Sequence, residues 1–379
     1  MGRFLRSERE TLERLLPGLD QKLGGIELAV LERPGSPGPE VFRAAGGPGL
    51  LVPGDHGGLG AGALAAVRVQ RAVGARSPSL AVASTMHHFS VAGLVEASRH
   101  STGFEWMMLE AIAERQLLVA SGFAEGRCGQ SVLSPTMRAE RRGERIVVSG
   151  SKKPCSLSRS MDLLTASVAV PATGGGPAQL AVALIPRGTP GLRVEPFWGS
   201  PVLAGAESDE VILDEVELLP DLVVATRSTA ERPLDDLQAT GFGWFELLIS
   251  ASYLGVASAL VERVLAAGRA DAALRADVAG QVDAAMLAVE GVARTLDGGA
   301  PADEELLASA LLVRFAAQDT IARVVPRCVE SLGGLAYVGS DEVAYLAGAA
   351  AALGFHPPSR ARSAAPLCDF YAGRPLRVA

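Results

Sequence analysis

Cysteine, lysine and long apolar runs are scarce in this chain of 379 residues, and each scarcity excludes a class of protein. The 4 cysteines lie far apart and form no C-x-x-C pair, so neither a disulfide framework nor a zinc site is expected. Lysine and arginine number 35 against 42 acidic residues, which gives a formal net charge of −7 and argues against nucleic-acid binding. No apolar run approaches the roughly 20 residues that a membrane span needs.

The N-terminus is charged from Arg3 to Glu10 and shows no signal peptide. We therefore expect a cytoplasmic protein that does not bind a membrane. Hydrophobic residues make up 48% of the chain, enough to bury a large core, and the length suggests two or three domains.

Hydrophobic periodicity divides the chain into three regions. Apolar residues recur at spacings of three and four in 8–16, 62–73 and 102–116, which predicts helices. Short β-branched segments separated by turn residues then predict strands at 145–149, 163–170, 180–185 and 211–213. Long helical patterns return at 245–267, 274–296 and 304–332.

These textures predict a multi-domain α+β fold. Residues 1–116 form an N-terminal helical domain, 117–225 a middle antiparallel β-sheet or β-barrel domain, and 235–379 a C-terminal helical bundle. A small sheet between two helical regions must cover its apolar faces with them. Their junction is a natural place for a flat cofactor or a thin acyl chain.

Motifs in four places resemble the acyl-CoA dehydrogenase superfamily, and the likeness covers almost the whole chain. They are Val52-Pro53-Gly54-Asp55-His56-Gly57-Gly58-Leu59-Gly60, the hairpin Ile146-Val147-Val148-Ser149-Gly150-Ser151-Lys152, the strand 211–220, and Ser331-Leu332-Gly333-Gly334-Leu335-Ala336-Tyr337. The resemblance implies a middle β-barrel, a C-terminal four-helix bundle, a homodimer or homotetramer, and FAD between barrel and bundle. It also implies oxidation of an acyl thioester, carried by CoA or a carrier protein, by a general base and the flavin.

The resemblance assigns cofactor contacts to two loops and one helix end. Phe123, Ala124, Gly129 and Ser131 fall in the loop that wraps the flavin, and Ser156 supplies a hydroxyl near flavin N5 and O4. Glu330, Gly333 and Gly334 fall where the family binds the cofactor at the end of a long helix.

Several polar cofactor positions of the family are lost or reversed. Pro154 replaces a tryptophan that flanks the ring, Glu330 replaces a glutamine, and Gly348-Ala349-Ala350-Ala351 replaces an Arg-Asp-Ala-Arg stretch. The Arg-x-x-Phe-Gly segment for the FAD pyrophosphate has no match. Retention of FAD and its loss are both compatible with this pattern.

The catalytic base has two candidates. His356 takes the place of the glutamate in the family's Tyr-Glu-Gly-Thr turn, and Glu246 lies one residue from the base position of other members. A carboxylate among apolar residues has a raised pKa, which suits a base. The alternative for Glu246 is a first-turn glutamate favoured by the helix dipole, or an ion pair.

Three further residues are candidate substrate contacts, and no metal is expected. The resemblance puts His87 and His88 on the helix that lines the substrate side of the flavin, where buried core or capping histidines are the alternative. Arg127 suits a phosphate or carboxylate of the substrate, or is a solvated loop residue.

The primary hypothesis is a flavoprotein dehydrogenase of an acyl thioester in specialised biosynthesis, with Glu246 or His356 as base. The second is a member without FAD that performs isomerisation, elimination or cyclisation with His356, His87 or His88. The third is a non-catalytic partner of an intact homologue. A flavin monooxygenase is the fourth, because loss of the carboxylate base is tolerable when flavin accepts no substrate hydride; it predicts O₂ consumption with a supply of reduced flavin.

Overall fold

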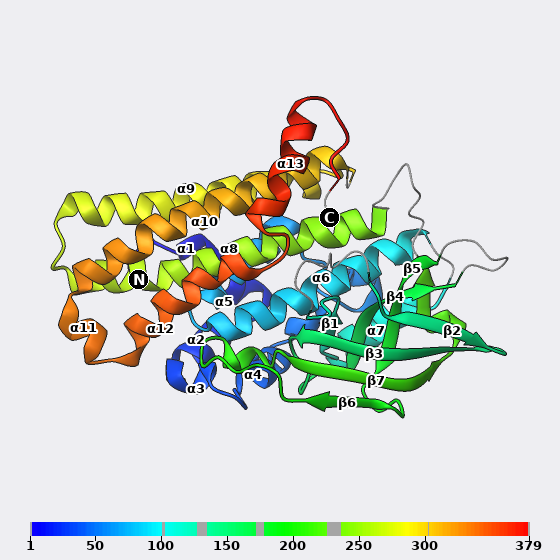
Figure 1. Ribbon diagram of the computed structural model, residues 1–379. Helices are drawn as coiled ribbons and strands as arrows, with labels where there is room; N and C mark the ends of the chain where they lie inside the picture. Colours follow the sequence, from blue (N-terminus) through cyan, green and yellow to red (C-terminus); the bar gives the residue numbers. More distant parts are fainter. Residues whose placement is uncertain are drawn as a thin grey trace.

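The computed structural model describes residues 2–100, 103–126, 135–171, 178–225, 236–301 and 303–377. Helices occupy both ends of the chain and strands lie between them (Figure 1). The described N-terminal helices are α1 (Arg6–Leu15), α2 (Leu19–Gly24), α3 (Leu28–Glu32), α4 (Gly38–Ala44), α5 (Ala63–Gly74), α6 (Pro78–His100) and α7 (Glu105–Arg115). Helices α1, α5 and α7 confirm the three predicted from apolar spacing.

The middle region forms one mixed sheet of β1 (Val119–Gly122), β2 (Arg138–Arg142), β3 (Arg145–Cys155), β4 (Leu163–Val170), β5 (Gln179–Pro186), β6 (Leu192–Glu195), β7 (Asp209–Leu218) and β8 (Val223–Ala225). All four predicted strands are present. The strand order is β6-β7-β3-β2-β4-β5-β8, with β1 beside β4. The path ends at β6 and β8, which do not pair in the described residues, so the predicted barrel is not confirmed.

The sheet also departs from the predicted antiparallel pairing. Strand β1 runs parallel to β4, with Val119 opposite Leu163. Some forty residues separate these two partners in the chain, and a connection of that length allows a parallel crossover. Short turns, such as the one between β2 and β3, keep the antiparallel pairing that the sequence predicts.

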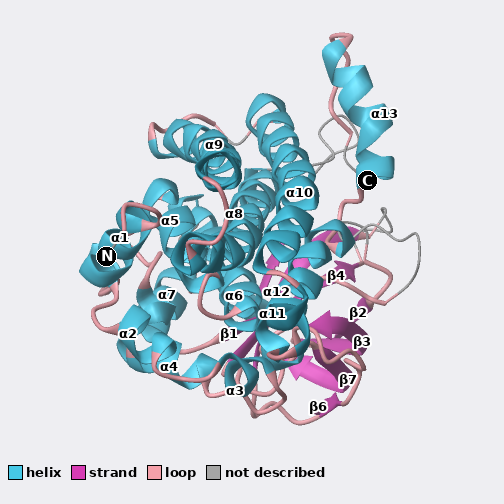
Figure 2. Cartoon of the chain, turned by 90° about the vertical axis from the view of Figure 1, so that its left-hand side faces the viewer, coloured by secondary structure: helices cyan, strands magenta, loops and turns pink. Residues whose placement is uncertain are grey.

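The C-terminal region is helical again, as predicted. It contains α8 (Asp236–Ala267), α9 (Ala272–Asp297), α10 (Glu304–Leu332), α11 (Gly334–Val338), α12 (Asp341–Ala350) and α13 (Arg360–Tyr371). Helices α8, α9 and α10 pack against one another, and α6 lies between α8 and the sheet (Figure 2). The strands therefore meet the bundle through α6 and the N-terminal part of α8.

Helix α8 is the centre of the helical part and contacts α5, α6, α9, α10 and α12. Its segment Ala239–Ala267 is long and apolar enough to cross a membrane, but 94% of its most apolar window is buried inside the protein. That burial is typical of the core helix of a soluble protein.

Glycines let α5 and α8 approach until their backbones touch. A Cβ on Gly255 would lie 2.3 Å from the carbonyl oxygen of Arg71, and a Cβ on Gly74 would lie 2.2 Å from that of Ser252. No side chain fits at either position, so this crossing fixes how closely the N-terminal helices pack on the bundle.

Gly255→Ala is expected to lower the free energy of unfolding by about 1–3 kcal/mol, because the helices must separate to admit the methyl group. Gly291→Ala in α9 is the matched control, since a Cβ there meets nothing within 4 Å. Both changes gain the same helix propensity, and the control should be stabilised by about 0.5–1 kcal/mol. Urea unfolding followed by circular dichroism measures both; equal midpoints would contradict the close crossing.

Candidate active site

A cavity of about 790 Å³ lies between the sheet and the helices. One side is formed by α6 and the N-terminal part of α8, and the other by β1, β4, β5 and the end of β3. The remaining lining residues come from loops, from β8 and from the C-terminal region: 123–126, Trp198, Ser200, Val202, Leu203, Ser208, Val224, Gly348, Ala352, Phe355, His356 and Pro357. The cavity lies at the junction of the sheet and the helical regions, where the sequence predicts a site for a flat cofactor or an acyl chain.

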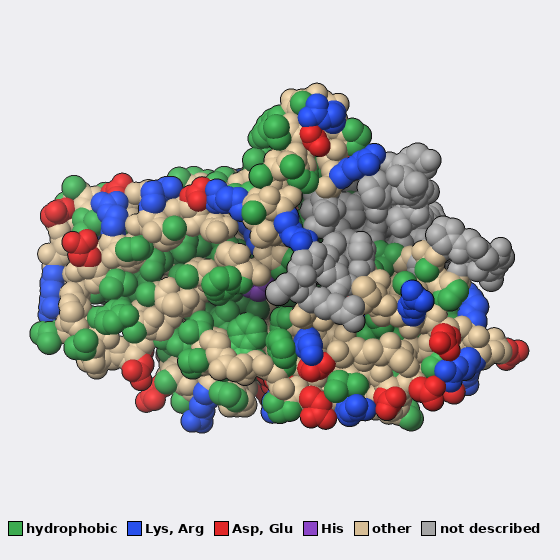
Figure 3. Space-filling model, in the orientation of Figure 1, with side chains coloured by type: hydrophobic (Ala, Val, Ile, Leu, Met, Phe, Trp, Pro, Cys, Tyr) green, Lys and Arg blue, Asp and Glu red, His purple; other side chains and the backbone are tan. Residues whose placement is uncertain are grey.

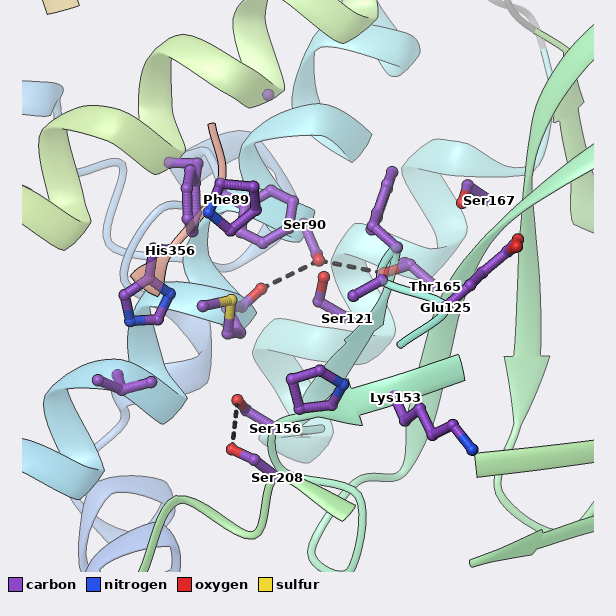
Figure 4. Close-up of a pocket in the computed structure, with 18 of the residues that line it drawn as sticks. Phe89, Ser90, Ser121, Glu125, Lys153, Ser156, Thr165, Ser167, Ser208 and His356 are labelled. Carbon is purple, nitrogen blue, oxygen red and sulfur yellow. Dashed lines mark hydrogen bonds between the residues drawn. The ribbon is translucent and has the colours of Figure 1, made fainter. Parts of the chain in front are cut away.

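Hydroxyl groups supply most of the polar atoms in the wall (Figure 4). Ser90 and Thr165 lie 3.1 Å apart, joining α6 to β4. The hydroxyls of Ser156 and Ser208 lie 3.0 Å apart beneath them. Ser121 lies between these two pairs (Figure 4). These groups accept or donate hydrogen bonds without carrying charge, so they suit the polar edge of a planar ring.

The charged side chains in the wall have partners within the protein. Glu125 accepts hydrogen bonds from Lys152 Nζ at 2.9 Å and from the backbone N–H of Thr136 at 3.0 Å. Lys153 Nζ donates to Glu210 at 3.0 Å. Among the described wall residues, neither charge is left over to bind an ammonium or a carboxylate of a ligand.

Aromatic rings make much of the remaining wall. Phe89 on α6 packs against Phe123 with ring centroids 5.6 Å apart and against Phe245 of α8 at 5.5 Å. Phe242 lies one turn before Phe245. This part of the wall is apolar, and it favours a neutral, flat or aliphatic ligand.

His356, one of the two predicted bases, lies in the wall of the cavity. Its Nε2 atom is 2.8 Å from the hydroxyl of Tyr253, a fully buried residue of α8. Burial, and next the Arg314 guanidinium, lower the pKa of His356 to about 3. The imidazole is therefore neutral at ordinary pH, and a group with so low a pKa is a weak base.

Arg314 of α10 holds the turn that carries His356. The guanidinium donates to the carbonyl oxygens of Pro357 at 3.1 Å, Pro358 at 3.2 Å and Leu353 at 3.3 Å, and also to that of His356. These acceptors all belong to the main chain. The position of His356 therefore depends on a buried cation.

Glu246 does not line the cavity. Its side chain is 0% exposed and pairs with that of Arg314, which is 1% exposed, at 3.0 Å. Burial raises the pKa of Glu246 to about 7, although the Arg314 guanidinium opposes the rise. The ion-pair alternative describes Glu246 better than the predicted base, because its carboxylate balances Arg314 and does not face a ligand.

His87 and His88 are turned away from the cavity. Met86, Phe89 and Ser90 of α6 line it, and at about 100° per residue the two histidines fall on other faces of that helix. His87 Nε2 donates to the carbonyl of Pro48 at 3.0 Å, and its Nδ1 accepts from the N–H of Val119 at 3.0 Å. The predicted substrate contacts are therefore core residues, and His87 ties β1 to the N-terminal segment.

His88 has no hydrogen-bond partner on either ring nitrogen within the part of the chain that the structure describes, and it is fully buried. It packs edge-on against Phe42, with ring centroids 5.6 Å apart. Burial lowers the pKa of His88 well below its ordinary value and lowers that of His87 to about 4.

These two imidazoles predict a loss of stability in acid. The unfolded chain binds more protons than the folded chain between pH 6.5 and 4, so the free energy of unfolding falls as the pH drops through that range. His87 alone accounts for about 3 kcal/mol at the lower limit. His88→Leu should flatten the dependence measured by urea unfolding at several pH values. His56→Leu, at a half-buried position, is the control; parallel curves for the two variants would contradict the prediction.

The predicted cofactor residues fall into three groups. Phe123, Ala124 and Ser156 line the cavity together. Gly129, Ser131 and the predicted substrate contact Arg127 lie outside the described residues. Glu330, Gly333 and Gly334 lie where α10 meets α11, at the end of the bundle away from the strands (Figure 1), and do not line the cavity.

Sequence reasoning missed Tyr253 and Arg314. Both lie inside long apolar helical stretches, where a buried polar side chain needs a partner. Arg314 stands out in the sequence as a charge that interrupts such a stretch, and that signal identifies it as a buried cation with an unknown partner. Ser90, Ser121 and Thr165 carry no signal of their own, because serine and threonine are common.

Comparison with known proteins extends this description. No protein-family model matches the chain. Isobutylamine N-hydroxylase of Streptomyces viridifaciens is 46% identical over 381 residues, which cover 99% of this chain and 100% of that protein. The nitrososynthase from Micromonospora carbonacea var. africana is 20% identical, with a TM-score of 0.82 over 98% of this chain and 99% of that one.

A second solved structure is that of TdsC, a dibenzothiophene monooxygenase from Paenibacillus sp. A11-2, in complex with FMN and indole. It is 16% identical to this chain, with a TM-score of 0.83, and the match covers 98% of each chain. The structural likenesses show the fold, and the sequence identity with the amine hydroxylase runs from end to end. The chain therefore belongs to the family of isobutylamine N-hydroxylase, on the acyl-CoA dehydrogenase-like fold.

Proposed function

We propose that the protein is a flavin-dependent N-hydroxylase of an apolar amine. The observation that carries the proposal is the 46% identity, over almost the full length of both chains, with isobutylamine N-hydroxylase. The cavity supports it, because its wall is apolar and its charges are paired within the protein. The sequence hypothesis of a flavin monooxygenase is thus the one that we adopt.

The cavity fits a flavin ring. Phe89 and Phe123 offer apolar ring faces, and Ser121, Ser156 and Thr165 offer hydroxyls for the polar edge of the ring. When bound, a reduced flavin supplies the two electrons that activate O₂. The reaction then balances as amine, O₂ and reduced flavin giving hydroxylamine, water and oxidised flavin.

FMN is the flavin that we propose, in place of the predicted FAD. Glu330, Gly333 and Gly334 do not reach the cavity of their own chain, and the sequence lacks the family's pyrophosphate segment. The structurally similar TdsC binds FMN. The single phosphate of FMN needs fewer protein contacts than the pyrophosphate and adenosine of FAD.

The amine should bind as the free base. The wall offers no unpaired carboxylate among the described residues to hold an ammonium ion, and burial in an apolar site disfavours the charged form. The nitrogen lone pair that must attack oxygen is then available. The same wall argues against the predicted acyl thioester chemistry, because Glu246 is tied to Arg314 and a neutral His356 is a weak base for abstracting an α-proton.

The predicted homodimer or homotetramer stays a proposal. Hydrophobic side chains gather over α10 and α12 on the face shown in Figure 3. Leu335 and Val338 of α11 are 86% and 78% exposed. Light scattering of the purified protein tests whether copies associate; a monomer at micromolar concentration would reject the proposal.

Aerobic incubation of the purified protein with chemically reduced FMN and isobutylamine tests the function. We expect a hydroxylamine, seen by mass spectrometry as the gain of one oxygen atom, and a lower yield with reduced FAD. Butyryl-CoA with oxidised flavin under nitrogen is the parallel assay for the thioester hypothesis. Bleaching of the flavin there, with no hydroxylamine from the amine, would reject N-hydroxylation.

A further inference from the structure

The hydroxyl of Tyr253 has one described partner. Tyr253 is 0% exposed, and the only hydrogen bond of its hydroxyl within the described part of the chain joins it to His356 Nε2 at 2.8 Å. The rings of Tyr253 and His356 also pack against each other, with their centroids 5.4 Å apart. The residues are 103 positions apart in the sequence, so the fold alone brings them together.

The direction of this hydrogen bond follows from counting hydrogens. Burial raises the pKa of the Tyr253 phenol, which therefore keeps its proton. If Nε2 carried a hydrogen and donated it to Tyr253, the phenol hydrogen would have no acceptor in a fully buried place. Leaving a buried donor unpaired costs about 1–3 kcal/mol, whereas donation from the phenol to Nε2 leaves nothing unpaired.

The other ring nitrogen of His356 is the one that remains accessible. Nδ1 makes no hydrogen bond to the described residues, and it is not among their buried atoms that lack a partner. His356 itself lines the cavity. A neutral imidazole has one hydrogen, and with Nε2 accepting from Tyr253 that hydrogen must be on Nδ1.

We infer that Tyr253 is a positioning residue that holds His356 as its Nδ1–H tautomer, so that the imidazole presents a hydrogen-bond donor to the cavity. This gives His356 the opposite sense from the base predicted from the sequence, because the accessible nitrogen already carries its proton. Arg314 fixes the main chain of the same turn, so backbone and ring are held from two sides.

The inference deepens the proposed function and rests on it for its consequence. An N–H donor in an apolar site stabilises an oxygen atom on which negative charge develops, and such a donor is effective only when it is held in place beforehand. A hydrogen-bond donor at His356 Nδ1 therefore suits oxygen transfer to the amine. The hydrogen bond from Tyr253 to Nε2 keeps the hydrogen on Nδ1.

Nuclear magnetic resonance of the protein labelled with ¹⁵N-histidine tests the tautomer directly. Long-range ¹H–¹⁵N correlations show which ring nitrogen carries the proton. The signals of His356 are identified as those that disappear from the spectrum of the His356→Gln variant. We expect an unprotonated Nε2 and a protonated Nδ1 in the unmodified protein. A protonated Nε2 in that protein would overturn the inference without any variant of Tyr253.

Tyr253→Phe removes the donor and keeps the ring, so the preference for the Nδ1–H tautomer should be lost. Tyr345→Phe is the matched control, because Tyr345 is a phenol whose hydrogen goes to Glu32 instead. Its variant should leave the His356 pattern unchanged. An unchanged pattern in Tyr253→Phe would contradict the positioning role.

Turnover separates this inference from the proposed function. We expect Tyr253→Phe to lower kcat for N-hydroxylation by about 10–100-fold with little change in KM for the amine, and to add nothing to the loss in His356→Gln. A shifted tautomer with full kcat would overturn the positioning role. If no amine is hydroxylated at all, the proposed function fails, while the resonance data still decide the tautomer.

Discussion

Arg314→Met is expected to lower the free energy of unfolding by about 3–5 kcal/mol, because Glu246 loses its counter-ion and must take up a proton to stay buried. It also removes the donors that hold the main chain of residues 353–358. Hydroxylation should be lost with the turn. The shift of the urea midpoint and the hydroxylamine yield are the two measurements.

Arg360→Met is the control for this change. Arg360 pairs with Asp319 at 2.7 Å, but both side chains are about half exposed, so its loss should cost at most about 1 kcal/mol. Adding Glu246→Gln to Arg314→Met should recover part of the stability, because the neutral amide needs neither a counter-ion nor a proton. Arg314→Met that unfolds at the same urea concentration as Arg360→Met would show that the buried pair does not stabilise the fold.

Ser121→Phe is expected to reduce hydroxylation by about 100-fold or more, because a ring on this wall residue, which lies between the two hydroxyl pairs (Figure 4), enters the cavity and displaces the bound molecules. FMN binding, followed by quenching of flavin fluorescence, should weaken in parallel. Ser121 is buried in the short strand β1, so circular dichroism must show that the variant is folded.

Ser121→Ala distinguishes filling the cavity from losing the hydroxyl. The alanine variant removes only one uncharged polar atom, and we expect it to stay within about tenfold of the unmodified protein. Full activity in Ser121→Phe would place the reaction elsewhere in the protein. An equal loss in both variants would assign the effect to the hydroxyl and not to the space.

The secondary structure was predictable because its signals are local. The short apolar, β-branched run in 163–170 and the apolar spacing in 304–332 each depend on neighbouring residues, and β4 and α10 have these bounds. The closure of the sheet was not predictable, since it depends on whether two edge strands far apart in the sequence meet. Here β6 and β8 remain the ends of the path.

The candidate site was predictable only in part. Ser156 and His356 were found because each lies in a motif that resembles the family, and both line the cavity. The orientations of His87 and His88 depend on which face of α6 meets the sheet, and a lone histidine pair carries no sign of that face. The chemistry was harder still, because a fold resemblance does not specify the substrate.

The hydrogen bonds from Arg314 to the turn affect which substitutions the cavity wall can accept during evolution. The guanidinium donates hydrogen bonds to main-chain carbonyl oxygens, and every amino acid has such an oxygen. Phe355, whose side chain is 86% exposed, is thus free to mutate while the loop keeps its path, whereas His356 is also needed by the buried hydroxyl of Tyr253. A library randomised at position 355 would vary the lining of the cavity on an unaltered scaffold, which makes this corner of the protein well suited to directed evolution.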